Sequence, residues 1–204
     1  MAIADRIALI RSMYTSNLTH EPAIYKIHSG SEFTGRPTLG AWVTYGLGTV
    51  NQNLPGYVVM LDGKGGPISG AKNWTSGYMP ASYQGTVFRS QGDPILNLQH
   101  AKGMKAAEQR QVITSLNQLN AQHLAGREDN TNLSARIDSY ELAYKMQSSA
   151  PEAIDVNSEP QHIKDLYGLD GSRTDDFARK CILARRLVER DVRFIQIYSG
   201  GAHN

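Results

Sequence analysis

The hydrophobic pattern of the chain predicts short buried strands separated by amphipathic helices. Short apolar runs occur at residues 7–14, 57–61 and 192–198. Runs of this length, rich in β-branched and aromatic residues, are typical of strands that are buried on both faces of a sheet. We therefore expect three strands, with residues 57–61 in the centre of the sheet.

Three helices are predicted between and beside these strands. Pro22 fits the first turn of a helix, where the missing N–H of proline costs little, and Pro37 lies near the start of a second predicted helix. A third helix is expected to start at residues 172–176 and to lead into the last strand. Its predicted buried side carries Phe177, Cys181, Ala184 and Val188.

A helical hairpin is predicted over residues 104–148, as an insertion beside the sheet. Its first helix places an apolar face at intervals of three and four residues, made of Val112, Leu116, Leu119 and His123. Its second helix repeats this spacing with Leu133, Ile137, Tyr140 and Tyr144. Gly126 ends the first helix, and the short connection favours antiparallel packing.

Residues 62–93 are rich in glycine, serine, asparagine and proline, yet they are not expected to be disordered. The segment holds Trp74, Tyr78, Met79, Tyr83 and Phe88, which is more large apolar side chains than a disordered linker normally contains. We expect an ordered loop that packs on the domain and covers a site.

The alternation of strands and helices predicts an α/β fold with a mostly parallel sheet covered on both faces. A length of 204 residues suits one domain. The composition, with 40% hydrophobic and 20% charged residues, is that of an ordinary soluble globular protein. Residues 1–7 lack the apolar core of a signal peptide, and no run is long enough to span a membrane.

Charge and cysteine content exclude several classes of function. The formal net charge is +2, and basic residues alternate with acidic ones instead of forming a stripe, so the chain does not look like a nucleic-acid binder. The densest basic stretch, residues 179–190, falls on the polar side of a predicted helix and is interpreted as a solvated face. Cys181 is the single cysteine and is interpreted as a small buried hydrophobe.

Polar residues that follow the last predicted strand give the first candidate site. Ligand sites of open α/β sheets lie beyond the carboxyl ends of the strands. His203 comes just after such an end, beside two glycines, and imidazole nitrogen is a good ligand for zinc. We expect His203 to be a metal ligand, with a polar loop residue as an equally weighted alternative.

The end of the first predicted strand gives the second candidate site. Thr15 and Ser16 supply hydroxyls, Asn17 supplies an amide, and His20 follows as a candidate metal ligand. A hydroxyl placed near a helix amino terminus is suited to attack a phosphoryl or sulfuryl group. The simpler alternative is that these residues only turn the chain.

Several longer runs resemble one family. They are GRPTLGAW at residues 35–42, NLPGYVV at 53–59, GYMPASYQGT at 77–86, RIDSYELA at 136–143, and the segment 181–201. The chain is similar in these runs to the bacterial sulfatase-like proteins called domain of unknown function 1501, which are placed in the alkaline phosphatase superfamily.

The resemblance implies a three-layer α/β/α sandwich that is incomplete at its C-terminal side. It implies that the chain is a partial sulfatase-like domain over residues 1–204, an internal piece of an exported protein. It further implies that most ligands for a divalent metal, zinc or calcium, lie downstream. His20 matches a polar-His-Pro stretch of the family, and His203 immediately precedes its metal-binding run.

These expectations combine into one leading hypothesis and two alternatives. The leading one is a fragment of a metal-dependent hydrolase of small-molecule or glycan sulfate or phosphate esters, with Thr15 or Ser16 as the attacking hydroxyl. One alternative is a non-catalytic binding or surface protein that has kept the fold. The other is an inactive truncation.

Overall fold

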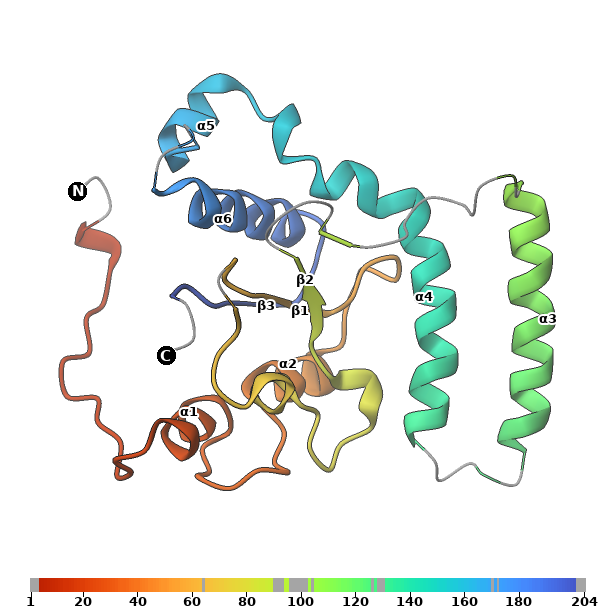
Figure 1. Ribbon diagram of the computed structural model, residues 1–204, viewed down its shortest axis with the longest axis horizontal. Helices are drawn as coiled ribbons and strands as arrows, with labels where there is room; N and C mark the ends of the chain where they lie inside the picture. The colour runs from red at the N-terminus through yellow and green to blue at the C-terminus, as the bar shows by residue number, and fades with distance from the viewer. Residues whose placement is uncertain are drawn as a thin grey trace.

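The computed structural model describes residues 4–63, 65–89, 94–95, 103, 105–125, 127, 131–169, 171 and 173–200 (Figure 1). Its sheet has three parallel strands in the order β2-β1-β3. They are β1 (Tyr57–Met60), β2 (Thr86–Phe88) and β3 (Phe194–Ile197). The predicted central strand at residues 57–61 is confirmed, because β1 pairs with both of the others.

Six α-helices and four short 3-10 helices surround the sheet in the described residues. The α-helices are α1 (His20–Ser29), α2 (Leu39–Leu47), α3 (Ala106–Leu124), α4 (Thr131–Ile154), α5 (Gln161–Tyr167) and α6 (Asp175–Val188). The 3-10 helices are η1 (Ala4–Arg6), η2 (Gly70–Trp74), η3 (Ala81–Tyr83) and η4 (Val156–Ser158). The predicted helices near Pro22, near Pro37 and after residues 172–176 are all present.

The larger core lies on one face of the sheet, under α4 and α6 (Figure 1). Val58 and Met60 of β1 point to this face because side chains alternate along a strand. They pack with Phe88 of β2, with Ile182 and Leu187 of α6, and with the second half of α4. These side chains are almost wholly removed from water, which stabilises the fold by about 25 cal/mol for each Å² of apolar surface buried.

A smaller core lies on the opposite face, toward α2 and η2. Tyr57 and Val59 of β1 pack there against Trp74, with Phe194 and Tyr198 at the margin. Gly40 lets α2 approach closely, since a Cβ at this position would lie 2.4 Å from the Tyr57 ring. The expected parallel sheet with a cover on both faces is therefore confirmed in the described residues.

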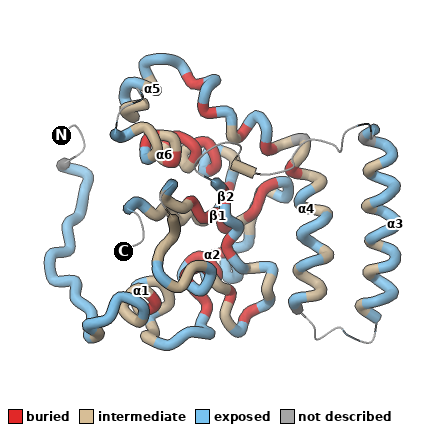
Figure 2. Tube along the Cα trace, in the orientation of Figure 1, coloured by how far each residue is buried: buried red, intermediate tan, exposed pale blue. Residues whose placement is uncertain are grey.

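Residues 7–14 do not form the first predicted strand, so that prediction is wrong. They run as an extended segment without sheet partners in the described residues, and their side chains are exposed (Figure 2). Leu9, for example, keeps 78% of its surface. A short apolar run forms a strand only where a neighbouring strand satisfies its backbone, and the pattern cannot tell whether one is there.

The loop over residues 62–93 is ordered wherever it is described, and it contains a strand that the pattern did not indicate. Trp74, Met79 and Phe88 are buried and anchor it, as expected. β2, however, has only three residues, of which two are exposed. A strand of three residues is too short to show an alternation of apolar and polar side chains. It is recognised only by its pairing with β1.

The predicted buried face of α6 is wrong by about one residue. Phe177 and Val188 are exposed, whereas Ala178, Ile182 and Leu187 are buried. The buried face also contains Lys180 and Arg186, whose charges a sequence reading assigns to solvent. Arg186 is accommodated because it donates to the Ala153 carbonyl at 3.0 Å and is paired with the buried Glu159 carboxylate at 2.6 Å.

Helices α3 and α4 lie side by side, as the hairpin prediction requires (Figure 1). The apolar face predicted for α3 is nevertheless wrong, since Val112, Leu116 and Leu119 are exposed. Helix α4 also continues to Ile154, past Pro151 and beyond residue 148, where the predicted hairpin ends. None of the helices in the described residues has an apolar stretch long enough to cross a bilayer.

Candidate functional site

Two strands deliver polar groups to one place at the carboxyl edge of the sheet. Met60 and Ile197 lie side by side at the ends of β1 and β3. Asp62 follows β1, and residues 198–200 follow β3. The backbone N–H of Gly200 donates to Asp62 Oδ2 at 3.0 Å, which links the two strand ends.

Lys180 reaches this edge from α6, and its side chain is only 1% exposed. Its Nζ lies 2.7 Å from Asp176 Oδ2 and 3.6 Å from Asp62 Oδ2, and it donates to the Tyr198 carbonyl at 3.2 Å. A buried ammonium group persists only where acceptors replace its water. We call Asp62, Asp176, Lys180 and Tyr198 the strand-end cluster.

Asp176 brings an unsatisfied acceptor to the strand-end cluster. Its Oδ1 is buried and has no hydrogen-bond partner in the described part of the chain. Buried carboxylate oxygens in native proteins normally accept a hydrogen bond or contact a cation. With two carboxylates around one ammonium group, the strand-end cluster carries a formal charge of −1.

A hydrogen-bonded row of side chains connects this edge to α1. Tyr198 Oη lies 2.9 Å from His28 Nε2 and also bonds the Gln196 amide, whose oxygen accepts from the Tyr57 hydroxyl. Burial raises the pKa of Tyr57 to about 12 and raises the pKa of Tyr198 as well. Burial lowers the pKa of His28, which favours the neutral imidazole.

Ser16, a predicted catalytic residue, lies in a second polar group around α1. Its hydroxyl donates to Glu32 Oε1 and accepts from Lys26 Nζ. Lys26 Nζ is 3.2 Å from Glu32 Oε1, and Asn17 Nδ2 donates to Glu32 Oε2 at 3.2 Å. These hydrogen bonds, the one from Ser16 first, lower the pKa of Glu32. We call Ser16, Asn17, Lys26 and Glu32 the serine cluster.

The other predicted site residues, Thr15, His20 and His203, are not members of the serine cluster. Thr15 is exposed, and its hydroxyl accepts from the Asn17 N–H at 3.4 Å, so it lies beside the serine cluster. His20 is exposed at the first position of α1. His203 lies outside the described residues. The structure thus brings Ser16 to a base and a cation.

A metal site is not completed by the described residues. No group of three or more His, Cys, Asp or Glu side chains with suitable spacing occurs among them. The strand-end cluster offers carboxylate oxygens, which suit calcium better than zinc, but Lys180 already neutralises part of their charge. The described donors alone therefore do not complete a zinc or calcium site, and we derive no chemical step through a metal.

Sequence reasoning missed three residues of the strand-end cluster. Asp62 carried a usable signal, since it stands two residues after the central strand, where a ligand site is expected. Asp176 and Lys180 gave no such signal, because their role depends on which side of α6 faces the sheet. Cys181, predicted to be a small buried hydrophobe, is half-buried, and burial raises the pKa of its thiol.

Comparison with known proteins gives one result. A family model described as "Protein of unknown function (DUF1501)" matches residues 1–202. No curated protein and no solved structure was found to match the chain.

Proposed function

Because the chain belongs to the DUF1501 family, whose function is unknown, we propose a function from its own residues and from the resemblance of its sequence runs to sulfatase-like proteins. The proposal is hydrolysis of sulfate or phosphate esters, on an α/β fold of the alkaline phosphatase type. The observation that carries it is the Ser16 hydroxyl, which hydrogen-bonds both the Glu32 carboxylate and the Lys26 ammonium group.

The serine cluster has the arrangement that activates a nucleophile. A hydroxyl becomes reactive when a base within hydrogen-bond reach accepts its proton and a third group orients that base. Glu32 is the base in this assignment, and Asn17 orients it through the bond to Oε2. Glu32 is ionised at neutral pH, as a base must be, and its lowered pKa makes it a weaker base than an ordinary glutamate.

The reaction then runs in two steps on these residues. Ser16 Oγ attacks the phosphorus or sulfur atom, its proton passes to Glu32, and the alcohol oxygen of the ester leaves with its bonding electrons. Water then cleaves the serine ester and releases sulfate or phosphate. Lys26 lies beside the attacking oxygen and stabilises the negative charge on the oxygens of the transferring group. Thr15 is the alternative hydroxyl.

The proposal that the reaction depends on a metal is supported only by the family resemblance. In related chemistry a divalent metal lowers the pKa of the attacking hydroxyl and stabilises charge on the ester oxygens. His20 and His203 are the candidate ligands of this chain. The affinity of the chain for zinc and calcium, compared with that of His20→Ala and His203→Ala, tests their role directly.

The test of the proposal is hydrolysis of p-nitrophenyl sulfate and p-nitrophenyl phosphate by the full chain. Rates are measured with added zinc or calcium and with a chelator. We expect Ser16→Ala to lower kcat at least about 100-fold. Ser12→Ala, which removes an exposed serine of the same segment, is the matched control and keeps the wild-type rate.

Three outcomes would count against it. Equal rates with added metal and with chelator would show that the reaction needs no metal. Equal rates for Ser16→Ala and wild type would show that Ser16 is not the nucleophile. A folded chain that hydrolyses neither ester would favour the alternative of a non-catalytic binding or surface protein.

A further inference from the structure

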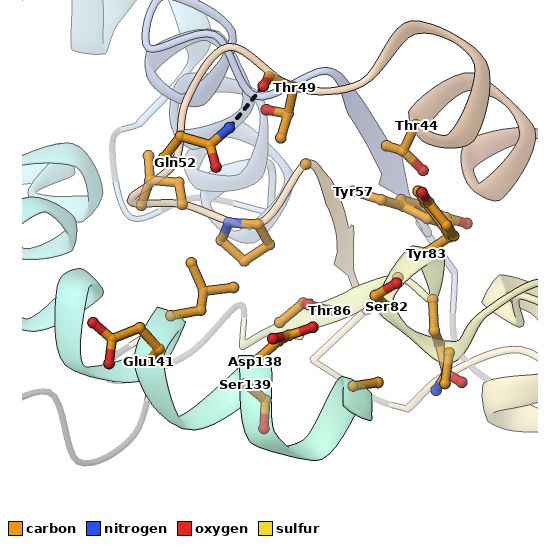
Figure 3. A pocket seen from close by; sticks show the side chains of 18 of the residues that line it. Thr44, Thr49, Gln52, Tyr57, Ser82, Tyr83, Thr86, Asp138, Ser139 and Glu141 are labelled. Carbon is orange, nitrogen blue, oxygen red and sulfur yellow. Dashed lines mark hydrogen bonds between the residues drawn. The ribbon is translucent and has the colours of Figure 1, made fainter. Parts of the chain in front are cut away.

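A pocket lies at the amino ends of β1 and β2, opposite the strand-end cluster. Its volume is about 760 Å³, within the range of small-molecule sites. Its walls are the loop of residues 48–56, the end of α2, η3 and one side of α4 (Figure 3). It contains none of the residues of the serine cluster or of the strand-end cluster.

The lining of this pocket mixes polar and apolar groups, and its charged residues are balanced. Hydroxyl and amide side chains line it from the loop of residues 48–56 and from η3, among them Thr49, Gln52 and Ser82 (Figure 3). The charged lining residues are two acids, Asp138 and Glu141, and two bases, Arg136 and Lys145. An anionic ligand such as a nucleotide calls for an excess of positive charge. The balanced lining favours an uncharged ligand with many hydrogen-bonding groups.

A row of four aromatic rings, three of them exposed, leads into the pocket. Tyr78, Trp42, Tyr45 and Tyr83 follow one another edge to face, with ring centroids 6.3, 6.3 and 5.2 Å apart. Trp42, Tyr45 and Tyr78 keep 46%, 54% and 68% of their surface exposed. Tyr45 and Tyr83 also line the pocket. We call these four residues the aromatic row.

Exposed aromatic rings beside a pocket that holds hydroxyl and amide groups match the chemistry of a sugar chain. One face of a pyranose ring carries C–H groups, which pack on the electron-rich face of an aromatic ring. The ring edge carries hydroxyls, each able to donate and to accept. An apolar peptide would offer no hydrogen-bonding groups to the hydroxyls of this lining, whereas a sugar offers both donors and acceptors.

We propose that the pocket and the aromatic row bind a neutral oligosaccharide. The rings of Tyr45 and Tyr83 pack against the sugar rings, and Gln52 and Asp138 bond to the hydroxyls. This binding site is independent of the proposed hydrolysis, because the two use opposite ends of the sheet and share no residue.

The experiment uses the labelled full chain on an array of immobilised neutral oligosaccharides of glucose, mannose, galactose and N-acetylglucosamine, followed by titration of the best binder. We expect Tyr45→Ala and Tyr83→Ala to weaken binding at least tenfold. Tyr45→Phe keeps the ring and stays within about threefold of wild type. Gln52 is exposed, and we expect Gln52→Ala to weaken oligosaccharide binding as well, independently of the aromatic row.

The matched control is Tyr140→Ala. Tyr140 lies on α4 and is 44% exposed, but it does not line the pocket, so its removal leaves binding unchanged. Circular dichroism confirms that each variant is folded. The proposal is overturned if no neutral oligosaccharide binds, if Tyr140→Ala loses as much affinity as Tyr45→Ala, or if Ser16→Ala abolishes binding.

Discussion

Individual side chains at the carboxyl edge depend on neighbours that are distant in sequence. Lys180 is buried because Asp176, Asp62 and the Tyr198 carbonyl surround its ammonium group. His28 is half-buried because it contacts Tyr198, 170 residues further along the chain. Burial lowers the pKa of His28, and the effect of this shift on stability can be measured.

The first prediction concerns the pH dependence of stability. The folded pKa of His28 is lowered by burial, whereas in the unfolded chain it returns to its ordinary value of 6.5. As pH falls below that value the unfolded state binds more protons, so the free energy of unfolding decreases. We expect a larger decrease for wild type than for His28→Gln between pH 7.5 and 5.5, measured by urea denaturation.

His28→Gln is a suitable comparison because glutamine can still bond to the Tyr198 hydroxyl but does not titrate. All other ionisable groups are present in both proteins, so their contributions cancel in the difference. The same slope for both proteins would show that His28 does not carry the pH dependence.

At the scale of elements, α2 packs against the sheet through one glycine. Gly40 faces the Tyr57 ring and Phe194, and a methyl group there would lie 2.4 and 2.7 Å from them. Gly46, on the same helix, has open space around it. The two positions separate the effect of packing from the effect of helix propensity.

The second prediction compares alanine at these two positions. Gly40→Ala forces the rings of Tyr57 and Phe194 apart and costs about 1–3 kcal/mol of unfolding free energy. Gly46→Ala meets no neighbour and stabilises by about 0.5–1 kcal/mol, since alanine is the better helix former. Thermal or urea unfolding of both variants measures the difference. Stabilisation by both would mean that α2 does not approach the sheet this closely.

At the scale of the whole molecule, the sheet with α2, α4 and α6 forms a core, and α3 stands at its margin (Figure 2). None of the side chains of α3 whose exposure is described is buried. Arg110 of α3 bonds Glu141 of α4 at 2.8 Å and lies over the Tyr144 ring. Surface ion pairs of this kind contribute only about 0–1 kcal/mol each.

The third prediction is that α3 opens independently of the core. Regions with few buried apolar contacts exchange their amide hydrogens by local opening, and core strands exchange only by global unfolding. In hydrogen-exchange mass spectrometry we expect peptides from α3 to exchange orders of magnitude faster than those containing β1. Equal protection of the two would show that α3 is held as firmly as the sheet.

Local patterns in the sequence were sufficient for several elements and for one part of the candidate site. β1 is predictable because its four residues are all apolar, and both Pro-led helices carry their own start signals. Ser16 could be named because it stands in a polar stretch before a helix, whereas its partners Lys26 and Glu32 could not, since the chain must fold back to bring them together.

The sequence by itself determined the α/β class, the central strand and the positions of the helices, since these depend on spacing within about ten residues. Only the tertiary structure decided that residues 7–14 stay outside the sheet, that β2 joins it, and which side of α6 is buried. It also decided where Lys180 and the aromatic row lie. The physical reason is that burial and strand pairing are settled by contacts between distant segments, which a local pattern does not contain.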